Sequence, residues 1–309
     1  MATALIGVKG NRLLCEEIEM EIASCQRRKT VFGHTIITGI GGTGKTLIAK
    51  RTAEALGYLF REKEAAALKD RESVIRWLVD GDREGISAGK TVANFIDEAH
   101  RLYERQEVFY YPMMENRITS DKGDIFFRPF TLFAATTHPQ KLSAESFLTR
   151  FANEWEIPRY ELSVIKEIIG DFLTSHGIQW TWLEVTEIAK RSLGVPRVAK
   201  KLAAKVVAKV DSRMGTEVTK QDVMDVFRVM GIDDLGLRPI HREYLAVLFA
   251  GKGRPRGVNL LAAKLGKNVE EIEDRVEPIL LSLGLIDRHP QGRISTRAGE
   301  VHLACMGMV

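Results

Sequence analysis

One octapeptide, Gly39-Ile40-Gly41-Gly42-Thr43-Gly44-Lys45-Thr46, has the residue types and spacing of a phosphate-binding loop. An apolar stretch at 35–38 precedes it and a helix-forming stretch at 46–56 follows it. In such a loop the backbone N–H groups and the helix N-terminus face phosphate oxygens. Lys45 would place its charge on the β and γ phosphates, and the Thr46 hydroxyl would bind Mg²⁺. The sequence therefore predicts ATP and Mg²⁺ as ligands, with the nucleotide held by Gly39, Gly42, Gly44, Lys45, Thr46 and Leu47.

Two carboxylates stand at the end of a second apolar stretch, Val92-Ala93-Asn94-Phe95-Ile96-Asp97-Glu98. The carboxyl ends of strands in an open α/β sheet face the ligand crevice. There Asp97 would hold the magnesium ion through water, and Glu98 would polarise the attacking water. The alternative is two solvated acids at a strand end. Asn94 is polar in a stretch expected to be buried and therefore needs a hydrogen-bond partner.

The elements that must position these groups alternate in type along the first half of the chain. Strand-like stretches at 35–39, 58–61, 91–98, 130–137 and 153–158 predict a parallel α/β sheet. Helical patterns follow at 163–175, 182–192, 196–213 and 220–230, and residues 231–239 have the composition of a boundary. Three short helices and a β-like segment at 285–296 then predict a winged helix. We expect three domains, at 1–159, 160–234 and 235–309.

Composition sets the broad class of the protein. The chain has 309 residues, of which 45% are hydrophobic and 28% charged, so it is not a disordered or low-complexity chain. No apolar run approaches the roughly 20 residues of a membrane span, and the start of the chain lacks a secretory signal pattern. The three cysteines form no metal-ligand cluster. These features predict a cytoplasmic protein with no membrane contact.

Several longer stretches resemble one family. They are Phe95-Ile96-Asp97-Glu98-Ala99-His100-Arg101-Leu102, Tyr111-Pro112-Met113-Met114-Glu115, Leu148-Thr149-Arg150-Phe151 and Asp233-Asp234-Leu235-Gly236-Leu237. With these the chain resembles the RuvB family, AAA+ motors of Holliday junction branch migration, over nearly its whole length. The resemblance implies a AAA+ P-loop ATPase domain, a helical lid domain and a C-terminal winged-helix DNA-binding domain.

The resemblance also implies roles for four further residues. Thr137 matches sensor 1, a polar group for the γ-phosphate or the attacking water, with Thr136 as the neighbouring candidate. Arg150 matches the arginine finger, which acts in the site of the next subunit. Arg197 matches sensor 2 on the lid, and Tyr160 matches an aromatic residue beside the nucleotide. The alternatives are a turn cap for the threonines, a surface ion pair for Arg150 and interdomain packing for Tyr160.

The same resemblance implies partners. A finger that acts in trans requires an oligomer, and the family forms a hexameric ring. The substrate would be duplex or branched DNA, contacted mainly through its backbone. A RuvA-like partner docks in the family on a hairpin that corresponds to residues 117–127, and this segment is markedly shorter here.

Basic residues in the tail are the candidate DNA contacts. The stretch at 269–283, in the recognition-helix position, carries Glu270, Glu271, Glu273 and Asp274, so we do not expect it to read bases. Arg288 and Arg293 flank the wing turn and match DNA-contacting positions of the family. Arg254 and Arg256, with Lys252, lie in a basic loop at 251–257. The alternative for each is a solvated surface charge.

The main hypothesis is a ring-forming, ATP-driven DNA translocase that drives Holliday junction branch migration, in DNA recombination and repair. One rival is a AAA+ ATPase that loads or remodels another DNA-bound protein, which the short hairpin favours. Another is a nucleotide-dependent binding switch with negligible turnover. Asp97, Glu98 and Arg150 argue against the switch because a switch needs none of the hydrolytic groups.

Overall fold

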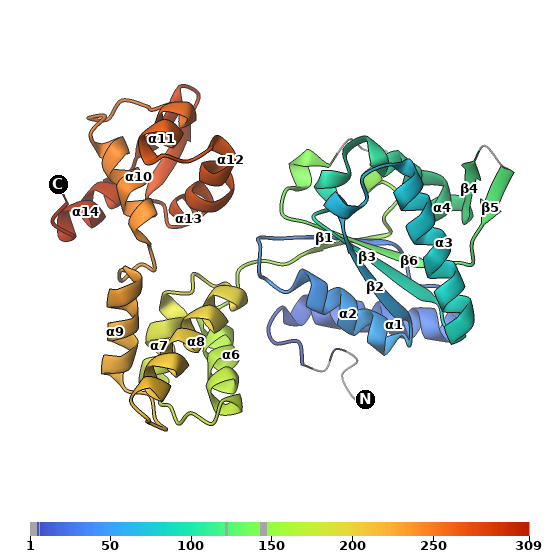
Figure 1. The fold of residues 1–309 in the computed structure, drawn as a ribbon, viewed down its shortest axis with the longest axis horizontal. Coiled ribbons are helices and arrows are strands. Elements are labelled where there is room, and N and C mark those ends of the chain that lie inside the picture. Colours follow the sequence, from blue (N-terminus) through green and yellow to red (C-terminus); the bar gives the residue numbers. More distant parts are fainter. Residues whose placement is uncertain (1–4, 6, 121–122, 143–146, 309) are drawn as a thin grey trace. The chain divides into compact units, whose positions relative to one another are not determined.

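The computed structural model describes residues 5, 7–120, 123–142 and 147–308. The chain forms two compact units (Figure 1). The first contains residues 1–164 with 195–197, and the second contains residues 165–194 with 198–309. Within the described part of the chain, no helix has the length and apolar character needed to cross a membrane.

A five-stranded parallel sheet is the centre of the first unit. Its strands, in spatial order, are β2 (Leu59–Glu64), β3 (Val92–Asp97), β6 (Thr131–Thr136), β1 (Thr35–Thr38) and β7 (Asn153–Glu156). All six residues of β6 and five of β3 are buried, as expected for parallel strands covered on both faces. The α/β fold predicted from the sequence is therefore confirmed. The register places the carboxyl ends of β1, β3 and β6 at one edge of the sheet.

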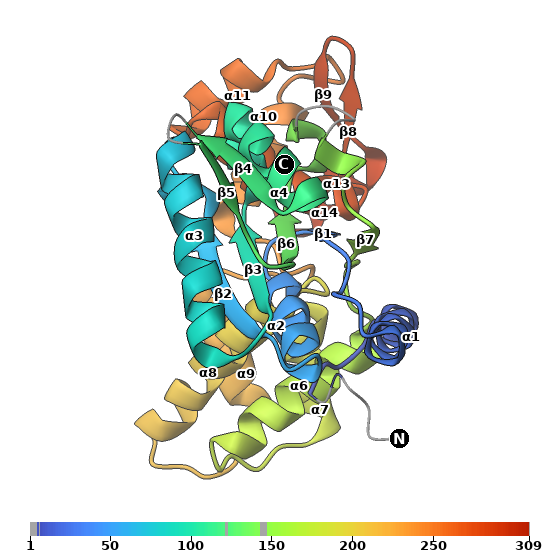
Figure 2. The same cartoon turned by 90° about the vertical axis from the view of Figure 1, so that its right-hand side faces the viewer.

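Alternate residues of these strands enter two apolar clusters on opposite faces. Ile36, Ile96 and Leu132 pack on one face, and Ile37, Phe95 and Phe133 pack on the other. The surrounding elements are α1 (Arg12–Arg28), α2 (Lys45–Ala55), α3 (Arg71–Ala88), a 3₁₀ segment at Ala99–Phe109 and α4 (Tyr110–Glu115). Figure 2 shows α3 beside β2 and β3. Other elements thus pack on both faces of the sheet, and ligands of such sheets bind at the carboxyl ends of the strands.

Asn94, the polar residue of β3, has the partner that the sequence required. Its side chain is 2% exposed, and Arg61 Nη1 donates to its Oδ1 at 3.4 Å. The same Nη1 donates to the Trp77 carbonyl at 2.7 Å. A Cβ atom at Gly81 would lie 2.3 Å from this nitrogen, so a larger residue at position 81 would make the arginine side chain shift.

A short antiparallel hairpin follows α4. Its strands are β4 (Arg117–Ser120) and β5 (Gly123–Phe126), which confirms a hairpin in the segment 117–127. The sequence Asp121-Lys122-Gly123 favours a turn between these strands, but Asp121 and Lys122 lie outside the described residues.

The second unit begins with a helical bundle, as predicted. Its helices are α6 (Leu162–Ser175), α7 (Trp182–Lys190), α8 (Pro196–Ser212) and α9 (Lys220–Met230). The first residues of two of them, 162–164 of α6 and 196–197 of α8, belong to the first unit. Thr181 with Glu184 caps α7 and Thr219 with Asp222 caps α9, both as capping boxes. Each cap satisfies N–H groups that the first helical turn leaves without a partner.

The winged helix completes the unit. It contains α10 (Pro239–Phe249), α11 (Val258–Leu265), α12 (Val269–Glu271), a π-helical turn at Ile272–Val276, α13 (Glu277–Ser282), the hairpin β8 (Ile286–His289) and β9 (Gly292–Ser295), and α14 (Arg297–Cys305). Leu245, Leu261, Leu280 and Leu303 share its core. The π turn stands just before Pro278, a residue that lacks an N–H and disturbs regular α-helical bonding. Helix α14 was not predicted from the sequence.

Asp233 joins the helical bundle to the winged helix inside this unit. Its carboxylate accepts hydrogen bonds from Arg242 at 3.2 Å and from the Leu235 and Leu237 N–H groups, and His302 Nε2 lies 3.0 Å away. Its carbonyl accepts from Arg191 Nε at 3.1 Å. The segment 231–239, predicted as a boundary, is thus a hydrogen-bonded junction.

Candidate functional site

The glycine-rich loop lies between β1 and α2, where the sequence predicted it. Gly39 and Gly42 have φ angles of +142° and +89°, which non-glycine residues rarely adopt. A Cβ at Gly39 would lie 2.5 Å from the Ile157 carbonyl oxygen, and one at Gly42 would lie 2.7 Å from Arg197 Cβ. Glycine is therefore required at both positions by conformation and by space. The loop leads into the N-terminus of α2, which begins at Lys45.

Lys45 is held inside this loop. Its Nζ donates to the carbonyls of Gly39 at 2.9 Å and Ile40 at 3.2 Å, and the residue is 7% exposed. Burial lowers the pKa of Lys45, while the nearby Glu98 and Asp97 carboxylates raise it. The ammonium group thus lies where a glycine-lined loop and a helix N-terminus meet, which is a suitable cradle for phosphate oxygens. Thr46 and Leu47 follow in the first turn of α2.

The two carboxylates lie at the end of β3. The Glu98 N–H donates to Asp97 Oδ1 at 2.9 Å, and burial raises the pKa of Asp97. Glu98 has a φ of +50°, an uncommon left-handed conformation for a residue with a side chain. This backbone turn directs the Glu98 side chain away from the strand and toward the end of β6.

Two threonines lie at the end of β6, and the two make different contacts. Thr137 Oγ1 donates to Glu98 Oε2 at 2.8 Å and lies 2.9 Å from His138 Nδ1. Thr136 is fully buried and accepts from the His138 N–H at 3.0 Å. Thr137 is therefore the threonine that contacts the Glu98 carboxylate.

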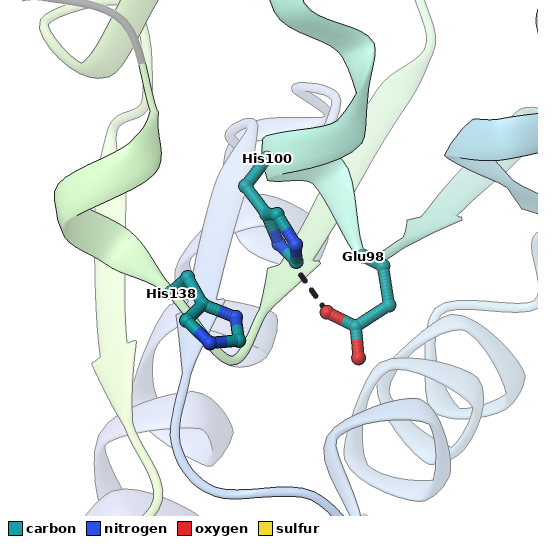
Figure 3. A group of neighbouring side chains, drawn as sticks. All are labelled: Glu98, His100 and His138. Carbon is teal, nitrogen blue, oxygen red and sulfur yellow. Dashed lines mark ion pairs between the residues drawn. The ribbon is translucent and has the colours of Figure 1, made fainter. Parts of the chain in front are cut away.

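Two histidines that the sequence analysis did not select complete this cluster (Figure 3). His100 Nδ1 lies 3.3 Å from Glu98 Oε2 and 3.0 Å from Thr136 Oγ1, and its ring is 4.8 Å from that of His138, centroid to centroid. Burial lowers the pKa of His100. Their positions were the available signal: His100 stands two residues after Glu98, and His138 directly follows Thr137. Residues that closely follow two neighbouring strand ends at one side of a sheet are expected to lie close together.

Tyr160 and Arg197, both in the first unit, are hydrogen-bonded to the glycine-rich loop. The Tyr160 hydroxyl donates to the Thr43 carbonyl at 2.8 Å, and the Arg197 N–H donates to the Gly42 carbonyl at 3.3 Å. The positive charge of Arg197 lowers the pKa of Lys45, which places the two cations within electrostatic range of one another. Both residues thus lie beside the loop that would hold a nucleotide.

Arg150 lies apart from this cluster in a turn after Leu148. Its guanidinium carbon is 3.9 Å from the centroid of the Tyr110 ring, a cation–π contact. Its Nε is buried and has no hydrogen-bond partner among the described residues. Among the described residues, no contact joins Arg150 to Lys45 or Glu98 of the same chain.

The two wing arginines, which the sequence predicted as DNA contacts, differ in exposure. Arg293 is 15% exposed, and it donates to the buried Glu277 carboxylate at 2.8 Å and to Glu273 at 2.6 Å. Arg288 is 54% exposed and donates to Glu277 at 2.9 Å. The Tyr244 hydroxyl also donates to Glu277, at 2.9 Å. A buried carboxylate needs such partners, so Arg293 is committed to the interior of the winged helix.

The basic loop at 251–257 lies against the wing. Arg256 and Arg293 exchange two backbone hydrogen bonds of 2.8 Å. Arg256 is half-buried, whereas Lys252 and Arg254 are exposed. The loop is thus tied to β9, the partner strand of β8, which carries the exposed Arg288.

Comparison with known proteins gives matches at both ends of the chain. Residues 3–156 match the family model of the Holliday junction DNA helicase RuvB P-loop domain, and residues 234–304 match that of the RuvB C-terminal winged helix domain. RuvB subunits of the Holliday junction branch migration complex from Trichormus variabilis and Synechococcus are 30% and 32% identical to this chain. Each alignment covers 95% of this chain and 81% of the relative. The structure of the Thermotoga maritima RuvB branch migration motor superposes with a TM-score of 0.85 at 28% identity, over 96% of this chain and 95% of that one.

Proposed function

The chain belongs to the RuvB family, and from this premise we propose that it works as an oligomeric ring that uses Mg²⁺ and ATP to move branched DNA. As a member of the family it is a P-loop ATPase, a RuvB-like motor of junction branch migration. We propose in addition the ring, the bound magnesium ion, the DNA contacts and the role of each site residue. We also propose that the chain divides into an ATPase domain (1–159), a lid (160–234) and a winged helix (235–309).

The observation that carries the proposal is the position of Glu98. Its carboxylate lies at the end of β3, beside Asp97 and within electrostatic range of Lys45, and it accepts a hydrogen bond from Thr137. A protein that only binds a nucleotide needs the loop and Lys45 but no such base. We therefore favour turnover over a binding switch.

We assign each residue of the site a role in hydrolysis. The loop N–H groups and Lys45 bind the phosphates, and Tyr160 and Arg197 border the same loop. Glu98 orients and deprotonates the attacking water, while Thr137 holds the Glu98 carboxylate in place. Thr46 and Asp97 are the residues that would hold Mg²⁺, and hydroxyl and carboxylate oxygens suit that ion. When bound, the ion would offset negative charge on the phosphates.

Arg150 would complete the site of a neighbouring subunit. In the single chain it stacks on Tyr110, away from the contacts of Lys45 and Glu98. A positive charge that reaches the neighbour's phosphates stabilises the charge of the transition state. The proposed ring follows from this requirement, because a closed ring gives every site a neighbour.

The decisive experiment uses branched DNA. We expect duplex or four-way DNA to stimulate ATP hydrolysis, and the protein to separate the arms of a labelled four-way junction only when ATP is hydrolysed. The reaction is run with and without a RuvA-type protein, because the hairpin β4–β5, at which the family docks that partner, is short here.

The outcomes separate three functions. Stimulated hydrolysis with junction movement supports the proposal. Stimulated hydrolysis without junction movement, even with the partner, would favour a AAA+ ATPase that remodels another DNA-bound protein. Nucleotide binding without hydrolysis would leave only the binding switch.

A further inference from the structure

Glu98, His100 and His138 place three metal-ligating side chains in one small region of the first unit (Figure 3). One ligand atom of each lies within 4.8 Å of those of the other two. They come from two segments that follow neighbouring strands, Glu98 and His100 after β3 and His138 after β6. The hydrolytic role proposed above uses Glu98 alone and gives the two imidazoles no task.

The spacing of these atoms suits a transition-metal ion. Two ligands of a tetrahedral zinc ion, each about 2.1 Å from the metal, lie about 3.4 Å apart. His100 Nδ1 and Glu98 Oε2 are 3.3 Å apart and thus already have this separation. The ligand atoms of the group lie up to 4.8 Å apart. The widest separation would therefore have to shorten by about 1.4 Å for all three to bind one ion.

The surroundings would orient the ligands and let an ion enter. Thr137 contacts His138 at Nδ1, which leaves Nε2 for an ion, and Thr137 also donates to Glu98. The Thr136 hydroxyl contacts Nδ1 of His100 itself and would give way to an ion bound there. Such outer hydrogen bonds fix the orientation of ligands in metal sites. The His100 side chain is 7% exposed, but that of Glu98 is 35% exposed, so the group is open on one side.

We propose that Glu98, His100 and His138 bind a divalent transition-metal ion such as Zn²⁺, and that this ion stops ATP hydrolysis. Two imidazoles and a carboxylate select zinc, cobalt or nickel over magnesium, which prefers oxygen ligands. The ion would take the carboxylate that orients water and so remove the base from the reaction. This inhibitory part rests on the proposed function, whereas the binding itself does not.

The binding is tested on the full-length, nucleotide-free protein with Co²⁺ as the probe, followed by its visible absorption. We expect one tightly bound ion per chain, displaced by Zn²⁺, and at least a tenfold weaker affinity in His138→Gln. His100→Gln should have the same effect, but His138→Gln is the main variant because His138 is less buried. His176→Gln, in an exposed part of the second unit, is the matched control and should bind as the wild type does.

The three free cysteines, Cys15, Cys25 and Cys305, could bind the same probe. A sulfur-to-cobalt charge-transfer band would reveal them and would count against the site. The site is also excluded if both histidine variants retain the wild-type affinity.

The inhibition is tested by ATP hydrolysis in excess Mg²⁺, as the ratio of rates with and without one equivalent of Zn²⁺. We expect a large loss in the wild type that a chelator reverses, and a ratio near one in His138→Gln. Unchanged hydrolysis by a zinc-loaded wild type would overturn the inhibition. A protein that hydrolyses no ATP even without zinc would instead refute the proposed function, while the cobalt titration would still decide the site.

Discussion

Glu98 depends on Thr137 for its position. The Thr137 hydroxyl donates a 2.8 Å hydrogen bond to Glu98 Oε2 and so holds this carboxylate oxygen at the end of β6. A hydrogen bond to a charged group contributes about 1.5–3 kcal/mol. The threonine that follows β6 is thus a positioning residue for the base across the edge of the sheet.

Thr137→Val should lower the rate of ATP hydrolysis about tenfold or more, because the variant keeps the shape of threonine but loses this bond. ATP affinity, measured by equilibrium binding, should stay within a few-fold of the wild type, since the loop and Lys45 are untouched. Thr137→Ser is the matched control and should recover most of the rate. A valine variant that hydrolyses ATP like the wild type would show that Glu98 does not need this contact.

At the scale of elements, the beginning of α9 shows how a helix cap depends on pH. The Asp222 carboxylate accepts bonds from Arg213 and from the Thr219 N–H and hydroxyl. The Arg213 bond is the largest cause that lowers the pKa of Asp222, from 3.8 to about 2. A carboxylate whose pKa is lower in the folded state stabilises that state above its unfolded pKa and loses this effect as the pH falls.

We expect Asp222→Asn to destabilise the second unit by about 2 kcal/mol above pH 4, since one pKa unit corresponds to about 1.4 kcal/mol. The difference from the wild type should shrink as the pH falls from 3.8 toward 2. It can be measured by urea denaturation with Trp180 and Trp182 fluorescence. Arg228→Gln, which breaks an ion pair with Asp225 in the same helix and has an exposed side chain, is the control and should cost less than about 1 kcal/mol. A difference for Asp222→Asn that does not change with pH would contradict the assignment.

The basic residues of the winged helix differ in how far they are engaged by other protein groups. Arg293 supports the buried Glu277, whereas Lys252 and Arg254 face solvent beside the wing. Arg256 ties the basic loop to β9 through its backbone, and Arg288 is shared between Glu277 and solvent. DNA phosphates would therefore meet Lys252, Arg254 and Arg288 first.

Joint substitution of Lys252 and Arg254 by Ala should weaken duplex binding about equally for unrelated sequences. It should also flatten the dependence of log affinity on log salt concentration by roughly 0.9 per lost phosphate contact. Titrations by fluorescence anisotropy at several salt concentrations measure both effects. Lys201→Ala with Lys205→Ala, two exposed lysines of α8, is the control of equal charge. Unchanged binding, or a loss that depends on base sequence, would refute this contact.

At the scale of the whole molecule, hydrolysis would be a property of the ring. Glu98 would serve the site of its own subunit, and Arg150 would serve that of a neighbour. Glu98→Gln should bind ATP without turnover, because the magnesium-binding Asp97 is retained and the base is lost. Arg150→Ala should bind ATP and lose on the order of 10³-fold or more in rate.

Mixtures of these two variants, each inactive alone, should recover part of the hydrolysis. Some interfaces then contain an intact Glu98 and an intact Arg150. Steady-state ATP hydrolysis over a series of mixing ratios measures the recovery, and native mass spectrometry verifies that mixed rings have formed. Inactivity at every ratio, with mixed rings present, would mean that Arg150 does not act in trans.

The sequence by itself determined the features that depend on neighbours along the chain. The loop Gly39–Thr46 needs only local spacing, and the strands and the bundle helices need only the pattern of their apolar residues. The sequence indicated that Asn94 needs a hydrogen-bond partner but could not identify it, because Arg61 reaches Asn94 from another strand. The family resemblance selected Thr137, Arg150 and Arg197 from stretches that composition alone would not distinguish.

Tertiary structure alone decided which distant side chains meet. The parallel pairing of β3 with β6 brings His138 to Glu98 and His100, across about 40 positions of sequence, and makes Thr137 rather than Thr136 the partner of Glu98. The fold of the winged helix likewise turns Arg293 inward, because Glu277 is buried and needs a positive partner there. Strand register and burial are set by the packing of the whole domain, so local spacing in the sequence does not contain them.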